Sequence, residues 1–334
     1  MHGTGLTLAG LQSWDFPALR FIMRNMEYTT DRKAAGKPLL FVYNPHAGSS
    51  KILESLNALL SQVVASGRRV EVHPTQGPRD ATEKVLRDRD QYARIIAAGG
   101  DGLFHEVVNG LAGCDIPVGY VPVGTVNDFA STHQLSFDPQ AAMKTALEGE
   151  VHTVDAGSFN GEVFTYVAAV GIGTQAAWDT SQDMKKRFGT LAYVASVIQS
   201  IDFTHWENNS ARMAIETDDR SFAGDFTYGM VCNTFSVGGS DILVPNEANL
   251  SDGLLEYLFI RRPMNLTELN QILRSLASRD FSSPFFEWGQ TRALHVQSEA
   301  AHWTLDGEYG GEITDAEIRC LPGFLHLVKD PKPA

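Results

Sequence analysis

Two kinds of apolar segment alternate between residues 38 and 150, and this alternation constrains the fold more than any other feature of the chain. Strand-length apolar runs occupy 39–43, 70–73, 93–98 and 116–122. Segments with helical or charged-helix patterns occupy about 51–66, 78–89, 102–111, 127–131 and 138–148. Strands that alternate with helices predict a parallel sheet with right-handed crossovers.

After about residue 151 the pattern changes to short alternating runs separated by turn residues. This pattern is typical of an antiparallel sandwich or barrel. Two helices are expected to interrupt it, near 182–201 and 265–278, with apolar stripes that pack on the core. Residues 1–36 show no clear period, and we expect a loosely packed N-terminal extension. The chain is therefore expected to be α/β plus β in class.

Composition narrows the class of protein further. A length of 334 residues suggests two domains. The net charge of −13 argues against a nucleic-acid partner, because neutralising phosphates needs clustered Lys and Arg. The three cysteines are far apart, which indicates neither a disulfide framework nor a zinc site. No run approaches the roughly 20 apolar residues of a membrane span, and no secretory signal is visible, so we expect a cytoplasmic protein.

Glycine-rich turns follow two successive predicted strands, at 99–102 and 124–127. Each precedes a predicted helix, and the N-terminus of a helix offers N–H groups to a phosphate. Each turn also has a purely structural explanation, with Asp101, Asn127 or Asp128 as an ordinary residue at a helix start. Two such turns at the ends of successive strands are expected to lie close together, which favours a phosphate site.

Two further segments carry weaker signals. Residues 44–50 follow the first strand and contain small residues that leave room for a triphosphate, although many loops begin in this way. In 305–311, two carboxylates flank Gly307, and one of them can act as the base that phosphoryl transfer needs. Taken locally, the Asp-Gly pair of this segment is better explained as a hairpin turn.

Together the four segments resemble the diacylglycerol kinase catalytic-domain family, which also contains sphingosine kinases and many bacterial lipid kinases. The match runs from about Pro38 to Val328. The resemblance implies a phosphofructokinase-like parallel-sheet domain of 37–150 plus 313–334, and a β-sandwich lipid-substrate domain of 151–312. The active site is expected in the cleft between them. It implies an ATP- and Mg²⁺-dependent kinase that phosphorylates diacylglycerol to phosphatidic acid.

Site roles follow from the resemblance, position by position. Glu308 would be the general base, and Asp101 and Asp128 would support the phosphates and the catalytic Mg²⁺, with Asp155 close by. A structural Mg²⁺ would be held by the side chain of Asp252 and the carbonyls of Asn249 and Leu254. The expected ATP-binding residues are Asn44, Pro45, His46, Ala47, Gly48, Thr75, Gly100, Asp101, Gly102, Leu103, Glu106 and Thr125.

The sequence departs from the family pattern at two positions, since Leu103 stands where the family usually has Thr and Ser131 where an Arg often occurs. These departures favour one alternative, a catalytically weakened nucleotide- or lipid-binding paralogue. Two further alternatives stay open: a kinase of another lipid alcohol (a sphingoid base, an isoprenol or phosphatidylglycerol), since no motif identifies the acceptor, and a soluble kinase of a small polyol or of NAD, which uses a similar first domain. The expected partners are a membrane lipid, met at the inner face of the bilayer by transient peripheral association, and a second copy of the chain as a homodimer.

Overall fold

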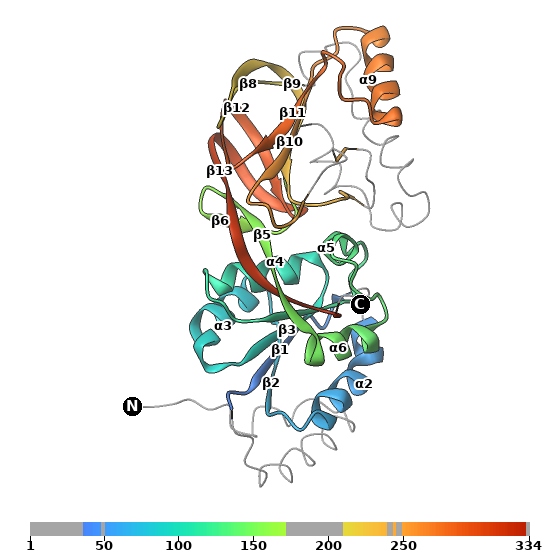
Figure 1. Ribbon diagram of the computed structural model, residues 1–334, viewed down its shortest axis with the longest axis vertical. Helices are drawn as coiled ribbons and strands as arrows, with labels where there is room; N and C mark the ends of the chain where they lie inside the picture. The colour runs from blue at the N-terminus through green and yellow to red at the C-terminus, as the bar shows by residue number, and fades with distance from the viewer. Residues whose placement is uncertain (1–35, 48–50, 172–209, 239–242, 245–248, 332–334) are drawn as a thin grey trace.

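The computed structural model describes residues 36–47, 51–171, 210–238, 243–244 and 249–331. They form two lobes, joined by two long strands (Figure 1). We call the elements of Leu39–Glu148 the lower lobe and those of Glu162–Leu305 the upper lobe. The predictions for 182–201, for Gly48 and for most of the N-terminal extension fall outside the described residues.

The lower lobe is a parallel sheet with helices on both faces. Its elements are β1 (Leu39–Tyr43), α2 (Lys51–Ala65), β2 (Val70–Pro74), α3 (Asp80–Asp88), a 3₁₀ turn (Arg89–Gln91), β3 (Arg94–Gly99), α4 (Asp101–Leu111), β4 (Val118–Pro122), α5 (Asp128–Thr132) and α6 (Pro139–Glu148). The strand order β4-β3-β1-β2 is parallel throughout. The alternation seen in the sequence thus corresponds to alternating strands and helices, with ends shifted by a residue or two.

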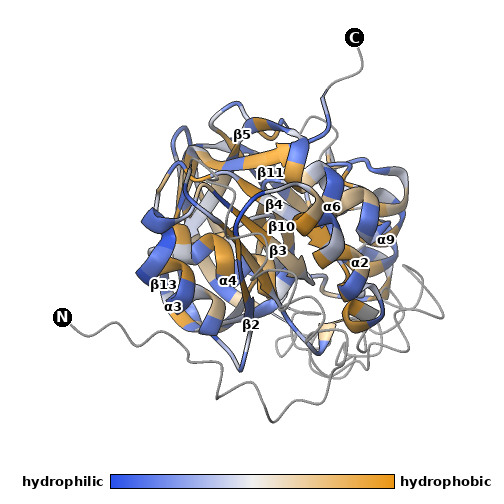
Figure 2. Ribbon diagram, turned by 90° about the horizontal axis from the view of Figure 1, so that it is seen from below, coloured by the Kyte–Doolittle hydropathy of each residue, from blue (hydrophilic) through white to orange (hydrophobic). Residues whose placement is uncertain are grey.

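All five residues of β1 are buried, which explains its continuous apolar run. Successive side chains point to opposite faces of a strand. Leu40 and Val42 accordingly belong to the core beneath α3 and α4, whereas Leu39 and Phe41 belong to the core beneath α2 and α6. Figure 2 shows these apolar strands between helices with hydrophilic outer faces.

The upper lobe consists of antiparallel strands and one described helix. Its elements are β6 (Glu162–Phe164), β7 (Val167–Gly171), β8 (Ala211–Thr217), β9 (Ser221–Cys232), β10 (Leu255–Arg261), α9 (Leu266–Ser278), β11 (Phe286–Thr291) and β12 (Ala293–Leu305). Instead of two separate sheets, β7, β9, β8 and β12 form a closed ring of pairings. The ring closes because β9 and β12 are long enough for each to pair with β7 at one end and with β8 at the other.

The apolar stripe of the 265–278 segment is only partly in the core. Ile272 is buried against the core that contains Leu258 and Phe286, as expected. Leu266, however, is 58% exposed, which corrects the expectation for this position. It is the first residue of α9, directly after the Asn265 cap.

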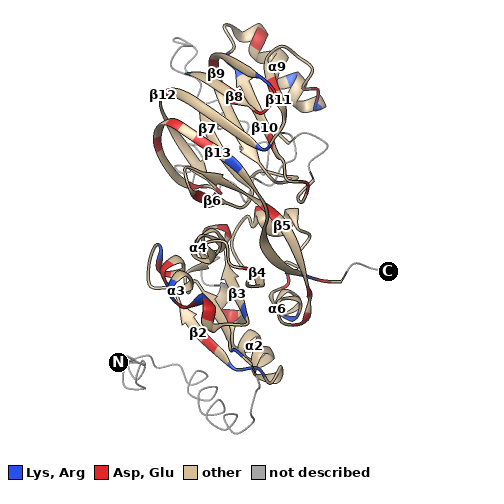
Figure 3. Cartoon of the chain, turned by 60° about the vertical axis from the view of Figure 1, so that its left-hand side comes forward, with Lys and Arg blue, Asp and Glu red and all other residues tan. Residues whose placement is uncertain are grey.

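Strands β5 (Glu150–Phe159) and β13 (Glu308–Lys329) pair with each other and run from one lobe into the other (Figures 1 and 3). β13 pairs with β12 as far as Arg319 and with β4 at Leu327, so one 13-stranded mixed sheet spans both lobes. Ile313 still pairs with Ala301 of the upper lobe, so the return to the lower lobe occurs later than the expected residue 313. A mixed α/β chain is confirmed.

Candidate active site

The two glycine-rich turns touch each other at the carboxyl ends of β3 and β4, as the sequence predicted. A Cβ atom on Gly124 would lie 2.4 Å from the Cα atom of Gly100, so position 124 needs glycine, whereas a Cβ atom on Gly100 would lie 3.3 Å from the Gly124 Cα atom, a tight contact. Asn127 holds the second turn, because its Oδ1 accepts from the Gly124 N–H and its Nδ2 donates to the Gly124 carbonyl, both at 3.0 Å. Asn127 adopts φ 57°, a left-handed conformation that Asn tolerates better than most residues.

Asp101 and Asp128 lie side by side beneath these turns. The Asp101 carboxylate accepts from the backbone N–H of Asp128 at 3.1 Å and of Phe129 at 3.3 Å, which caps α5. Asp128 Oδ2 accepts from the Gly238 N–H at 2.8 Å. Burial, followed by the charge of Asp128, raises the pKa of Asp101 to about 7. The structure thus brings together two of the predicted acidic residues.

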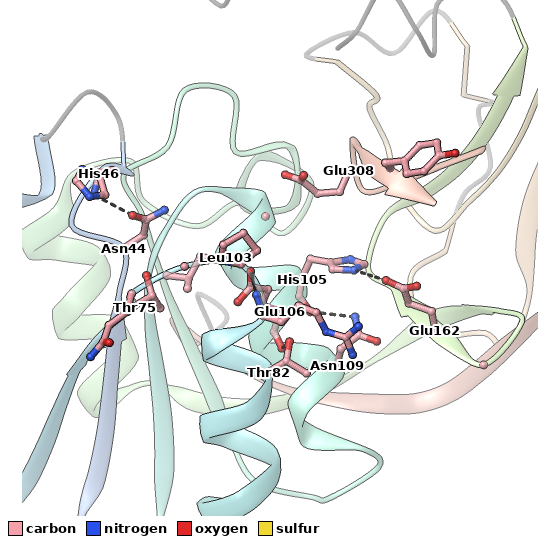
Figure 4. Close-up of a pocket in the computed structure, with 17 residues that line it drawn as sticks. Asn44, His46, Thr75, Thr82, Leu103, His105, Glu106, Asn109, Glu162 and Glu308 are labelled. Atoms are coloured by element: carbon pink, nitrogen blue, oxygen red, sulfur yellow. Dashed lines mark hydrogen bonds and ion pairs between the residues drawn. The ribbon is translucent and has the colours of Figure 1, made fainter. Parts of the chain in front are cut away.

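A cavity of about 920 Å³ lies between the lobes, and Figure 4 shows the side chains around it. Its lining residues are Asn44, His46, Thr75, Gln76, Gly77, Pro78, Arg79, Thr82, Gly102, Leu103, His105, Glu106, Asn109, Gly161, Glu162, Glu308 and Tyr309. Of the expected nucleotide ligands, this set includes Asn44, His46, Thr75, Gly102, Leu103 and Glu106. It does not include the described residues Pro45, Ala47, Gly100, Asp101 and Thr125.

Glu308 enters this cavity from the upper lobe. It is the first residue of β13, directly after a turn in which Asp306 and Gly307 have φ values of 51° and 82°. Its carboxylate lies over the first turn of α4, because a Cβ atom on Gly102 would be 2.6 Å from Glu308 Oε1. The expected base therefore faces the helix N-terminus from the opposite wall of the cavity (Figure 4).

Asp306 fixes the turn that carries Glu308. It is 3% exposed, and its Oδ2 accepts from His105 Nδ1, the Thr165 N–H and the Thr165 hydroxyl. Its Oδ1 accepts from the N–H groups of Tyr166 and Val167. The sequence pointed to Asp306 as one of two carboxylates beside Gly307 and as a turn residue, and the structure shows that its carboxylate organises the segment before β7.

His105 lies between the two lobes, and the sequence assigned it no role of its own within the 100–106 segment expected at the ATP site. Its Nδ1 is 2.9 Å from Asp306 Oδ2 and its Nε2 is 3.2 Å from Glu162 Oε1. Burial alone would lower the pKa of His105, but its hydrogen bonds with the two carboxylates outweigh burial and raise the pKa to about 10. The same contact with His105 lowers the pKa of Glu162. No short-range pattern could have revealed this cluster, since 201 residues separate His105 from Asp306.

Two other predicted nucleotide ligands make contacts within the protein itself. Leu103 is 7% exposed, and its side chain covers Gly99, where an added Cβ atom would lie 2.8 Å from Leu103 Cβ. The leucine that replaces the usual threonine thus packs against the end of β3. The Glu106 carboxylate accepts from the N–H groups of Arg79 and Ala81 at the start of α3, at 2.9 and 3.1 Å.

Of the residues predicted to hold the structural metal, Asp252 lines a second cavity of about 510 Å³ at the waist of the molecule, whereas Asn249 and Leu254 are not among its lining residues. Asp155 lines this cavity with Asp252, and its carboxylate accepts from the N–H groups of Gly253 and Gly323, both at 2.7 Å. Asp155 therefore accompanies Asp252 rather than the Asp101–Asp128 pair. Within the described ranges, no group of three or more His, Cys, Asp or Glu is arranged to hold a metal.

The Asp252 carboxylate also accepts from the Leu254 N–H at 3.0 Å, so it serves as a turn residue in this structure. Oxygen donors suit Mg²⁺, which keeps several waters and needs few protein ligands. Glu256 adds an orphaned oxygen nearby, because its buried Oε2 has no hydrogen-bond partner among the described residues. The oxygen donors at this turn are of the type that a hard divalent cation prefers, although the described residues do not bring three acidic or histidine ligands together here.

Comparisons with known proteins identify relatives of this chain. Residues 38–159 match the family model of the diacylglycerol kinase catalytic domain. The chain is 32% identical to a diacylglycerol kinase from Staphylococcus saprophyticus over 86% of this chain and 91% of the relative. It is 32% identical to a diacylglycerol kinase from Bacillus subtilis over 88% of this chain and 96% of the relative.

Solved structures share the fold. One crystal structure from Bacillus anthracis str. Sterne aligns with a TM-score of 0.73 at 22% identity, over 90% of this chain and 99% of that chain. A second, of a diacylglycerol kinase from the same strain, aligns with a TM-score of 0.67 at 20% identity over the same shares. The family model and the curated relatives show that the chain is a lipid kinase. The chain belongs to the diacylglycerol kinase family.

The part of the chain that the structure describes has no helix long and apolar enough to cross a membrane.

Proposed function

We propose that this protein transfers the γ-phosphate of ATP to the hydroxyl of diacylglycerol, giving phosphatidic acid and ADP. The observation that carries the proposal is the Glu308 carboxylate over the first turn of α4, inside the inter-lobe cavity. Glu308 takes the proton of the acceptor hydroxyl as the acceptor oxygen attacks the γ-phosphorus. The bond from that phosphorus to the bridging oxygen breaks, and ADP leaves.

The N-terminal turn of α4 is the assigned binding site for the phosphates. Gly100 precedes the helix without a side-chain cap, and Gly102 and Leu103 line the cavity. The positive end of the helix dipole stabilises anionic phosphates there, and backbone N–H groups need no hydroxyl at position 103 to do so. This supports nucleotide binding despite the leucine.

Asp101 and Asp128 are the assigned residues for the catalytic Mg²⁺, and Asp252, with the carbonyls of Asn249 and Leu254, for a structural one. When bound, Mg²⁺ neutralises charge on the phosphates. The burial that raises the pKa of Asp101 to about 7 supports the first assignment, since two adjacent buried carboxylates repel each other until a cation compensates them.

The acceptor is proposed to be met at the bilayer surface, since diacylglycerol resides in membranes. The cytoplasmic location, the transient peripheral association and the homodimer belong to the same proposal. A different lipid alcohol is the alternative acceptor, and the Glu308 geometry supports either one equally because a base acts on any hydroxyl placed beside it.

The test is a phosphoryl-transfer assay with labelled ATP, Mg²⁺ and diacylglycerol in mixed micelles. Parallel reactions offer a sphingoid base, an isoprenol, phosphatidylglycerol, a small polyol and NAD. Labelled phosphatidic acid as the dominant product is the expected result. Transfer to another acceptor alone would reassign the substrate. ATP binding without transfer to any acceptor would indicate a paralogue that has lost the chemistry.

A further inference from the structure

The α4 helix contacts both upper-lobe hairpins that border the cavity. His105 reaches the β12–β13 turn through Asp306 and the β5–β6 hairpin through Glu162. One turn further along α4, Asn109 exchanges two hydrogen bonds with the backbone of Val163 in β6, both at 2.9 Å. The phosphate-facing helix and the hairpin that carries Glu308 are therefore connected through side chains, and His105 is the residue that contacts both hairpins.

The ring of His105 is oriented for a doubly protonated imidazolium. Each ring nitrogen lies within hydrogen-bond distance of a carboxylate oxygen, and a carboxylate only accepts hydrogen bonds when ionised. A neutral ring could donate to only one of them. Asp306 is 3% exposed and His105 is 7% exposed, so the pair is shielded from water, whereas the Glu162 side chain is 54% exposed.

Removing the His105 cation would leave Asp306 as a buried carboxylate held only by neutral donors. That carboxylate shapes the turn in which Asp306 and Gly307 have positive φ values, two residues before the base. A shift of this turn changes the position of Glu308 relative to Gly102, where the carboxylate already lies in close contact with the helix. Misplacement of a catalytic group by about 1 Å can cost on the order of 100-fold in rate.

We propose that His105 is a positioning residue for phosphoryl transfer, which aligns the Glu308 carboxylate with the N-terminus of α4 by binding Asp306 and Glu162 together. The effect of His105 on catalysis rests on the proposed kinase activity. The structural content of the inference, that His105 holds the β12–β13 turn, does not depend on that activity. The two parts can therefore be measured separately.

The experiment compares His105→Gln with His295→Gln in the full-length chain. His295 is a matched control, because it also pairs with an aspartate, Asp315 at 2.9 Å, on the same β12–β13 hairpin but outside the cavity lining. With ATP and diacylglycerol varied, His105→Gln is expected to lower kcat by about 10- to 100-fold, with KM for ATP changed less than about threefold. His295→Gln is expected to leave both constants unchanged.

Amide hydrogen exchange provides the second readout. The N–H groups of Thr165, Tyr166 and Val167 bond to Asp306, so they are expected to exchange faster in His105→Gln than in the wild type or in His295→Gln. Unchanged exchange, or an unchanged kcat in a folded variant, would overturn the inference. If the wild type phosphorylates no acceptor, the proposed function fails, and the exchange result alone decides whether His105 holds the turn.

Discussion

At the scale of single residues, the site depends on small residues that leave space for the reacting groups as much as on the reacting groups themselves. Gly102 illustrates this, because the Glu308 carboxylate occupies the space next to its Cα atom. Since the obstructing atom is the end of a flexible side chain, a methyl group there displaces the base without disturbing the backbone.

Gly102→Ala is therefore expected to lower kcat by about tenfold or more, while stability is kept or raised by up to about 1 kcal/mol, since alanine favours a helix. Kinetics and urea unfolding on the same preparation check this. Gly110→Ala serves as the contrast, because its Cβ atom would lie 2.7 Å from Val85 Cβ and 2.8 Å from the Thr82 carbonyl oxygen. That variant is expected to lose about 1–3 kcal/mol of stability. If the free energy of unfolding of Gly102→Ala falls along with its kcat, as expected of a structural defect, the assignment of Glu308 to the space beside Gly102 is contradicted.

His105 also predicts a pH dependence of stability. Its pKa in the folded protein, about 10, is above the ordinary value of 6.5, so protonation of the ring stabilises the fold. This contribution is complete below pH 6.5 and is lost as the pH rises through 10. Asp306 and Glu162 face the ring directly, with Arg79 near Glu162 and Asp101 near Asp306.

The free energy of unfolding is therefore expected to differ between wild type and His105→Gln by more at pH 6 than at pH 9.5. Urea titrations of both proteins at the two pH values measure it. A difference that is constant, or that grows with pH, would show that the ring is not protonated in the fold.

At the scale of elements, α4 is the structural centre of the site, because different sides of this helix contact different neighbours. Gly102 faces the base, His105 the upper lobe and Glu106 the start of α3. Glu106 lines the cavity, but its carboxylate is occupied by the N–H groups of Arg79 and Ala81. Its main effect should therefore be on α3 rather than on a ligand.

Glu106→Ala is expected to lower the free energy of unfolding by about 1–2 kcal/mol, because it removes the acceptor for two N–H groups at the start of α3. KM for ATP should change by less than about threefold. Chemical denaturation and nucleotide titration of the same samples give both values. A large rise in KM with unchanged stability would instead make Glu106 a direct nucleotide ligand.

The elements also show which parts of the fold and of the site could be predicted from the sequence. The lower-lobe strands and helices were predictable because short continuous apolar runs, such as the wholly buried β1, alternate with longer segments that have a helical period. The contact between Gly100 and Gly124 followed from the rule that parallel strands end at one edge of the sheet. The His105–Asp306 contact joins residues 201 positions apart and has no periodic signal, so only the folded chain reveals it.

At the scale of the whole molecule, the two lobes share one sheet and one of the three apolar clusters formed by the described residues, which includes Leu40 of the lower lobe and Leu258 of the upper lobe. The domain boundary was harder to predict than the strands, because β5 and β13 are strands that continue from one lobe into the other. A register irregularity between Leu321 and Leu325 marks the place where β13 leaves the upper lobe.

Asp155 holds this waist, since its two carboxylate oxygens accept from Gly253 in the upper lobe and from Gly323 in the irregular part of β13. Asp155→Ala is expected to reduce the free energy of unfolding by about 2 kcal/mol, because two backbone N–H groups lose their acceptor. Asp315→Ala, on the exposed face of β13, is the control and should cost less than about 0.5 kcal/mol. Thermal unfolding followed by circular dichroism measures both, and equal stability of the two variants would rule out this role for Asp155.

The most direct test of the proposed mechanism is the turnover of Glu308→Gln beside Glu312→Gln, an exposed carboxylate on the same strand. Both proteins are assayed with ATP, Mg²⁺ and diacylglycerol, and nucleotide binding is measured on the same samples. We expect kcat of Glu308→Gln to fall by about 10²–10⁴-fold with ATP affinity retained, and Glu312→Gln to match the wild type. A Glu308→Gln protein that keeps kcat within a few-fold of the wild type would contradict the assignment of Glu308 as the base.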